Sequence, residues 1–176
     1  FVRGGEVSEA QSPGVKCAGL VNQSAMHRAR DGANGVGMHT HPRAGRAVAA
    51  LEDGFLPIAM TATKFYDEIA YHDYEGVSLY LDERERVLNA LGDAKAMILR
   101  NHGLLTVGRT VPEAFLYLYR LERACQVQID AAAAGTLRLL TDNVAARSRE
   151  DMKKGLTEKP KGDLEFAALM RKLDKT

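Results

Sequence analysis

The sequence predicts an α/β domain, in which strands alternate with helices and the helices cover a sheet. Short apolar runs bounded by turn residues recur along the chain, and helix-capping patterns stand between them. The length of 176 residues suffices for one domain with a real core and is not clearly enough for two. We therefore expect one α/β domain.

Composition and charge argue against several classes of partner. The chain has 24 basic and 23 acidic residues, a net charge of +1, so we expect neither nucleic acid nor a membrane surface as partner. No apolar run approaches the roughly 18 residues that a membrane span needs, and no signal peptide is visible. Cys17 and Cys125 are far apart, which favours a reducing, cytosolic setting over a disulfide framework. Because the first residue is Phe1, we expect a processed or incomplete form of a longer chain.

The first third of the chain alternates loop, helix and strand. Residues 1–18 are rich in glycine, serine, proline and charge, and are predicted to be irregular. A short helical pattern covers 22–30. The run GVGMHTH over 35–41 predicts a strand, and Pro42 then opens a predicted helix that reaches residue 51.

The middle of the chain is less regular. Residues 55–63 (FLPIAMTAT) predict a buried strand followed by a loop, whereas 64–76 (KFYDEIAYHDYEG) fit neither a helix nor a clean strand. A helix is predicted over 82–91, because this segment opens with a capping box and Gly92 follows it.

The last part combines two buried strands with the longest helix. The apolar runs 96–99 and 104–108 predict the strands. Thr110 opens a helix with a capping box, and Gly135 ends it. A charged linker is predicted over 147–162, followed by a short helix over 163–172.

Three histidines are candidate metal ligands. His39 and His41 are two residues apart on a predicted strand, so their side chains face the same way, about 6.6 Å apart along it. His102 directly follows a second apolar strand, and Gly103 lets the backbone turn or approach closely there. Three neutral imidazoles with a fourth position open are the pattern of a catalytic zinc. The alternative is three unrelated histidines in polar turns.

Four segments carry a resemblance to a known family. They are MHTHPRAG (38–45), IAYHDYEG (69–76), MILRNHGLLTVGRTVPEAF (97–115) and LYLYRLERACQVQI (116–129). In this order and spacing they resemble the class II aldolase/adducin family, over about residues 19–135.

The resemblance implies a fold and an assembly. We expect a three-layer α/β/α sandwich with a central, mostly antiparallel sheet, assembled as a homotetramer with the metal near a subunit interface. We assign residues 1–145 to a class II aldolase/adducin-type domain that lacks its usual N-terminal part. Residues 146–176 then form the charged linker and the short C-terminal helix.

The resemblance also implies two functions. Enzyme members hold Zn²⁺ or a similar ion such as Mn²⁺ or Fe²⁺, which here assigns His39, His41 and His102 as ligands. They act as lyases or epimerases on small hydroxy-carbonyl, sugar-like substrates, and the ion polarises a carbonyl and stabilises an enediolate. The alternative is a non-catalytic, adducin-like module that binds actin filaments. The IAYHDYEG-type segment favours this alternative, and the retained histidines disfavour it.

The chain departs from the aldolases at two places. The glutamate that serves them as a base falls near Gly19, where no carboxylate stands, and the phosphate-binding serines of that loop are absent. The glycine-rich phosphate loop would lie upstream of Phe1. We therefore do not expect aldol cleavage of a phosphorylated ketose.

Other residues are candidates for proton transfer. Tyr71 falls where aldolases place a catalytic tyrosine that reaches a neighbouring subunit's site, and a phenol with a pKa of about 10 suits a proton donor. The alternative is a packed aromatic. Glu68 and Glu75 are candidate bases, or else solvated loop carboxylates. Further candidates, each with a structural alternative, are His72 (fourth ligand or shuttle), His27 (substrate contact), and Arg100 and Arg109 (anion binding).

Overall fold

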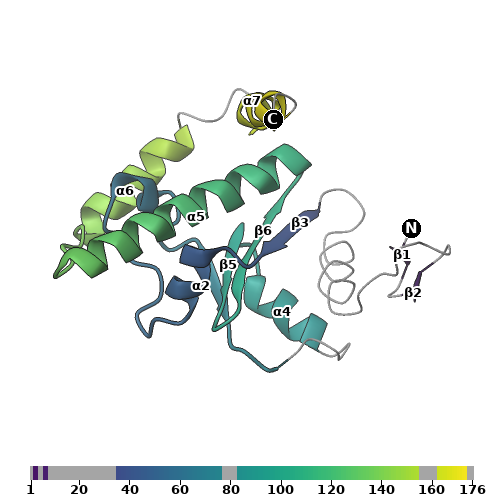
Figure 1. Ribbon diagram of the computed structural model, residues 1–176, viewed down its shortest axis with the longest axis horizontal. Coiled ribbons are helices and arrows are strands. Elements are labelled where there is room, and N and C mark those ends of the chain that lie inside the picture. Colours follow the sequence, from purple (N-terminus) through teal and green to yellow (C-terminus); the bar gives the residue numbers. More distant parts are fainter. Residues whose placement is uncertain (1, 4–5, 8–34, 77–82, 155–161, 174–176) are drawn as a thin grey trace.

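A computed structural model describes most of the chain from residue 35 onward and two short segments before it (Figure 1). The described ranges are 2–3, 6–7, 35–76, 83–154 and 162–173. The helix predicted over 22–30, with His27, lies outside the described residues, as do Cys17 and Gly19.

Two very short strands stand near the start, where irregular chain was predicted. β1 (Val2–Arg3) pairs with β2 (Glu6–Val7) in an antiparallel ladder.

The central sheet has four strands in the order β3-β6-β5-β4. They are β3 (Val36–Thr40), β6 (Gly103–Gly108), β5 (Ala96–Leu99) and β4 (Ile69–His72). β6 runs antiparallel to both of its neighbours, and β4 runs parallel to β5. The mostly antiparallel sheet is thus confirmed. Every residue of β5 and β6 is buried, which explains their unbroken apolar runs.

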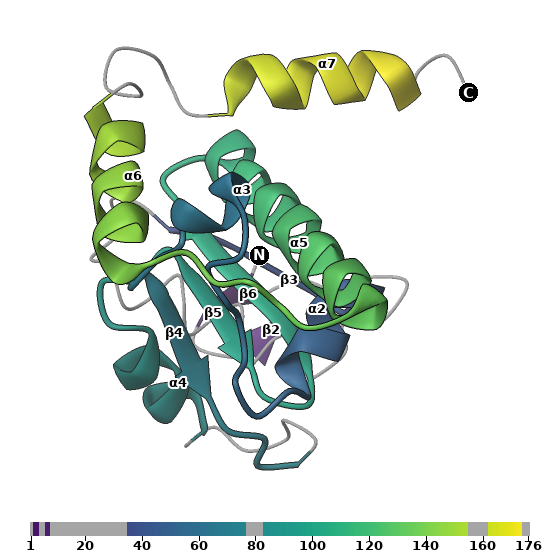
Figure 2. The same ribbon diagram turned by 90° about the vertical axis from the view of Figure 1, so that its left-hand side faces the viewer.

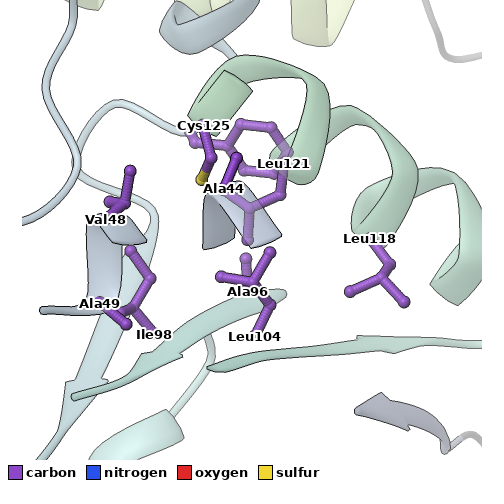
Figure 3. Close-up of a cluster of buried hydrophobic side chains, with 10 residues drawn as sticks. Ala44, Val48, Ala49, Ala96, Ile98, Leu104, Leu118, Leu121 and Cys125 are labelled. Atoms are coloured by element: carbon purple, nitrogen blue, oxygen red, sulfur yellow. The ribbon is translucent and has the colours of Figure 1, made fainter. Parts of the chain in front are cut away.

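Helices cover both faces of this sheet, which confirms the layered α/β/α arrangement. α2 (Arg43–Ala49) and α5 (Val111–Ala134) pack on one face, and α4 (Glu83–Leu91) packs on the other. Figure 1 shows α5 and α4 on opposite sides of the strands. Two buried apolar clusters result. One, drawn in Figure 3, joins the sheet to α2 and α5 through Ala44, Val48, Ala49, Ile98, Leu104, Leu118, Leu121 and Cys125. The other joins it to α4 through Val87, Leu91, Met97, Leu99, Leu105 and Val107.

Three further helices lie around the α5 layer. α3 (Met60–Thr63) is a single turn that contacts α6 (Asp142–Lys154), and α7 (Asp163–Leu173) rests on α5 with no buried residue of its own (Figure 2). α6 shows that the first half of the segment predicted as a linker is helical. None of the described helices is long and apolar enough to cross a membrane.

Local signals predicted most helix ends correctly. At the start of α5, Thr110 Oγ1 accepts a hydrogen bond from Glu113 N at 3.2 Å, as a capping box requires. The stop after α4 is Gly92, whose φ of 49° lies in the left-handed region that glycine adopts freely. The helices predicted at 42–51 and 163–172 are also confirmed, with ends shifted by up to two residues.

Two strand predictions were wrong. No strand forms over the first part of 55–63, because Gln128 of α5 binds this backbone instead, accepting from Leu56 N at 2.8 Å and donating to Gly54 O at 2.7 Å. Conversely, β4 forms within the segment 64–76, which was predicted to be irregular. Its parallel pairing with β5 decides this, and no local pattern reveals such pairing.

Candidate metal centre

The three predicted histidines meet at one end of the sheet. His39 lies on β3, His41 follows β3, and His102 stands in the turn between β5 and β6. One ring nitrogen from each lies within 4.8 Å of the others, and the ring centroids are 4.7 to 4.8 Å apart. Within the described residues, this is the one group of three or more side chains of metal-ligating type that converges in this way.

The register of β3 on β6 produces the convergence. His39 pairs with Leu105 and Thr40 with Leu104, so the end of β3 lies beside the start of β6. A Cβ atom added to Gly103 would lie 2.6 Å from Thr40 O and 3.0 Å from the His41 ring. Only glycine therefore allows β3 to approach the His102 turn this closely.

The turn that carries His102 is anchored to the end of α2. Asn101 has a φ of 55°, a conformation that asparagine tolerates better than most residues, and its N–H donates to Ala49 O at 3.0 Å. Arg100 Nη1 donates to the carbonyl oxygens of Leu51 at 2.7 Å and Glu52 at 3.3 Å. The two residues before His102 are thus held in place, Asn101 by a main-chain hydrogen bond and Arg100 by its side chain.

The hydrogen bond of His39 fixes its tautomer. Its Nδ1 lies 2.9 Å from Leu104 O, and because a carbonyl oxygen only accepts, Nδ1 carries the proton. The neutral ring therefore directs the lone pair of Nε2 toward His41, whose Nε2 lies 2.8 Å away. Without an ion, the His41 N–H donates to His39. Histidines that bind metals commonly donate their other ring N–H to a carbonyl in this way.

Burial favours the neutral form of the His39 and His102 rings, and metal binding requires neutral imidazole. Desolvation lowers the pKa of His39 from 6.5 to about 4, against the opposing hydrogen bond to Leu104 O. Desolvation also lowers the pKa of His102, with a smaller contribution from His41. Three imidazole nitrogen donors, with no cysteine or carboxylate among them, fit a divalent ion such as zinc that keeps a position open.

Tyr71 lies on the other face of the sheet from His39. It packs with the cluster under α2 and α5, whereas His39 shares the row and face of Leu105. The Tyr71 hydroxyl accepts from Phe55 N at 3.1 Å, and Arg100 lies over its ring at 4.5 Å. The structure therefore does not bring Tyr71 to the histidines of its own chain.

Glu68 is also remote from the three histidines. It precedes β4, at the opposite end of the sheet from the His102 turn, and it pairs with Lys153 at 2.6 Å and Arg149 at 3.8 Å. Within one chain, Glu68 thus serves to hold α6 against the start of β4.

Three further residues that the sequence suggested for the site are Glu75, Arg109 and His72. Arg86 Nε donates to Glu75 at 2.9 Å, and Arg109 pairs with Glu113 at 3.5 Å. The Nε2 atom of His72 is buried and has no hydrogen-bond partner among the described residues, and it lies 3.8 Å from Glu75 Oε1. None of these groups joins the histidine cluster.

One aromatic residue beside the three histidines, Tyr74, was not among the residues predicted from the sequence. The ring of Tyr74 lies 6.1 Å from the ring of His102, and 52% of this residue is exposed. It stands three residues after Tyr71 in the same motif. Only the end of β4, which the sequence did not predict, reveals that the chain turns toward His102 there.

A cavity of about 570 Å³ lies elsewhere, among α3, α5 and α6. Its lining residues are Met60, Thr61, Lys64, Tyr119, Arg120, Arg123 and Met152. None of the three histidines lines this cavity.

Comparisons with known proteins agree on a family. A family model described as the class II aldolase and adducin N-terminal domain matches residues 2–129. A Caulobacter vibrioides protein with a class 2 aldolase name is 40% identical over 161 residues, covering 92% of this chain and 62% of its own length. Rat alpha-adducin is 41% identical over 175 residues, covering 92% of this chain and 23% of its own length. The chain thus spans less than two thirds of these relatives.

Solved structures are similar as well. An aldolase II superfamily protein from Pseudomonas syringae gives a TM-score of 0.87 at 41% identity, covering 97% of this chain and 68% of that one. An L-fuculose 1-phosphate aldolase from Glaciozyma antarctica PI12 gives 0.70 at 32% identity, covering 84% and 57%.

Proposed function

The chain belongs to the family of class II aldolase and adducin N-terminal domains, and on this premise we propose that it is a divalent-metal-dependent lyase or epimerase. Its proposed substrate is a small hydroxy-carbonyl compound of the sugar type. The observation that carries the proposal is the convergence of three histidines from two separate stretches of chain. Packing alone gives no reason for three ring nitrogens to point at one place.

The residues present suit an ion in three ways. Leu104 O orients His39, the register of β3 brings His41 to it, and the anchored turn adds His102. Zinc is the first candidate, with Mn²⁺ or Fe²⁺ as alternatives. When bound, the ion would supply Lewis-acid polarisation of a substrate carbonyl.

Proton transfer requires a further group, and Tyr71 and Glu68 stay our predicted acid–base residues. Neither reaches the histidines of its own chain, so this role requires a site completed by a neighbouring copy. We therefore also propose a homo-oligomer, a tetramer as the resemblance implies. The cytosol is the proposed location, because the two cysteines give no sign of a disulfide framework.

Metal content tests the proposal. Protein purified without chelator is expected to carry close to one zinc-like ion per chain by elemental analysis. His102→Ala is expected to abolish binding, whereas His27→Ala serves as a control that retains it. Metal-free wild-type protein would refute the metal site, and equal loss in both variants would mean that the third ligand is wrong.

Activity is a separate test of the substrate class. We expect cleavage or epimerisation of small hydroxy-aldehydes or hydroxy-ketones that a chelator stops and added metal restores. Substrate turnover that survives complete metal removal would contradict the mechanism.

A second function is favoured by one finding, the 41% identity to alpha-adducin. On this alternative the chain is a non-catalytic, cytoskeletal module that binds actin. Co-sedimentation with actin filaments at modest salt would support it. Purified chain that stays in the supernatant while binding metal would favour the enzyme.

A further inference from the structure

We propose that Glu122 on α5 is a positioning residue for His41 and acts through the N-terminus of α2. The inference rests on the proposed metal site and adds a residue 81 positions away in the sequence from the ligand that it positions. It follows from how α2 begins, immediately after the HTH segment.

The N-terminus of α2 has no acceptor of its own. Its N-cap is Pro42, which makes no side-chain cap bond, and no acidic residue stands in the first turn. The first intrahelical bond runs from Arg46 N to Pro42 O at 2.9 Å, so the N–H groups of residues 43–45 lie before it. Such groups need partners from outside the helix, above all where water is excluded.

Glu122 supplies the acceptors for two of these three N–H groups. Its Oε2 accepts from Gly45 N at 2.7 Å and its Oε1 from Ala44 N at 3.3 Å. Gln126 Nε2 donates to the same carboxylate at 3.2 Å and so orients it. Ala44 and Gly45 are buried, and Figure 3 shows Ala44 close to Leu121 and Cys125 of α5. A negative charge at a helix N-terminus is favourable as well.

This contact bears on His41 because the His41 ring contacts the rings of His39 and His102 but packs in neither apolar cluster. His41 is exposed, whereas His39 and His102 are half-buried, so packing of its own side chain does not fix it. One residue, Pro42, separates it from α2, and the proline ring restricts that link to a φ of −71°. The place of the His41 ring therefore follows the place of the first turn of α2.

The same turn also touches the strand that orients His39. A Cβ added to Gly45 would lie 2.6 Å from the Leu104 side chain and 3.1 Å from Glu122 Oε2. Leu104 O in turn holds His39. Glu122 thus holds the first turn of α2 against β6, next to the place where His39 Nε2 and His41 Nε2 lie 2.8 Å apart.

Cobalt(II) titration of the purified 176-residue chain tests this role, read by affinity and by the visible d–d spectrum. We expect Glu122→Ala to bind cobalt at least tenfold more weakly with altered bands, in line with the effect of groups that orient metal ligands. Glu122→Gln keeps one oxygen acceptor and is expected to fall between. It also serves should the alanine variant fail to fold.

Gln128→Ala is the matched control. Gln128 also stands on α5 and also accepts from a backbone N–H, that of Leu56 at 2.8 Å, but in a segment that follows α2. We expect this variant to lose stability while keeping wild-type cobalt affinity and spectrum.

Two outcomes would overturn the role of Glu122 and leave the proposed metal site standing. Wild-type affinity and spectrum in both Glu122 variants would show that the contact does not position His41. Equal weakening by Gln128→Ala would show that cobalt binding follows general stability. A wild-type chain that takes up no cobalt would instead remove the proposed metal site and this inference with it.

Discussion

Replacing Gly103 by alanine tests the closeness of β3 and the His102 turn. Gly103 does not have a positive φ, so alanine fits the backbone and the effect is steric. The added Cβ would lie 2.6 Å from Thr40 O, about 0.8 Å inside ordinary van der Waals contact, and 3.0 Å from His41. Thr40 O is main chain and cannot rotate away, so β3 itself must shift.

The expected magnitude follows from this geometry. Overpacking of a buried contact costs about 1–3 kcal/mol, which for a domain of this size lowers the Tm by roughly 5 °C. Because the shift moves the backbone of both HTH histidines, metal affinity is expected to fall at least tenfold. Thermal unfolding without metal and isothermal titration with zinc measure the two effects separately.

Gly108→Ala is the control for this experiment. Gly108 ends the same strand, and its added Cβ would lie 2.5 Å from Ala114 N, far from the histidines. We expect a similar loss of Tm with unchanged zinc affinity. The reasoning is refuted if Gly103→Ala keeps wild-type Tm and affinity, or if Gly108→Ala weakens zinc binding equally.

Three further predictions address neighbouring features. The pKa of His39 is about 4 in the folded chain and 6.5 as its ordinary value, so the unfolded chain binds the proton first. The free energy of unfolding of the metal-free protein should therefore be constant above pH 6.5 and fall by at most about 3 kcal/mol as the pH falls to about 4. A urea midpoint that does not change over this pH range would contradict the burial of the His39 ring. Arg100→Ala removes two hydrogen bonds to carbonyl oxygens and a cation–π contact, and should lower the free energy of unfolding by about 1–2 kcal/mol; an unchanged urea midpoint would show that the turn needs no such anchor. Burial raises the pKa of Cys125 to about 12, so thiol reagents at pH 8 should modify it only upon unfolding, and rapid labelling of native Cys17→Ser protein would show that the α5 layer opens.

The histidine cluster could be predicted because each ligand has a local signal. The period of two along a strand aligns His39 with His41, and a histidine after a buried strand stands at a sheet end. The helix ends at Thr110 and Gly92 likewise depend on neighbours in sequence. Such signals work because the interactions behind them span only a few residues.

The contacts that complete the fold lie beyond that range. β4 is half-buried along its length and is defined by its pairing with β5, which stands about one helix later in the chain. Gln128 prevents a strand near Leu56 across 72 positions, and Glu122 reaches α2 across 77. No residue pattern in either partner announces these contacts, because each depends on where α5 comes to lie.

Leu104 belongs at once to the interior of the protein and to the candidate metal centre. Its side chain fills the cluster beneath α2, while its carbonyl oxygen holds His39. An ion that joined the HTH segment to His102 would also close the loop of about 60 residues between His41 and His102. Zinc at a hundred times its Kd would add about 2.7 kcal/mol to the folded state. In cells short of metal, a larger fraction of the protein would consequently be unfolded and open to proteases. The supply of the ion would then affect how much of the protein accumulates.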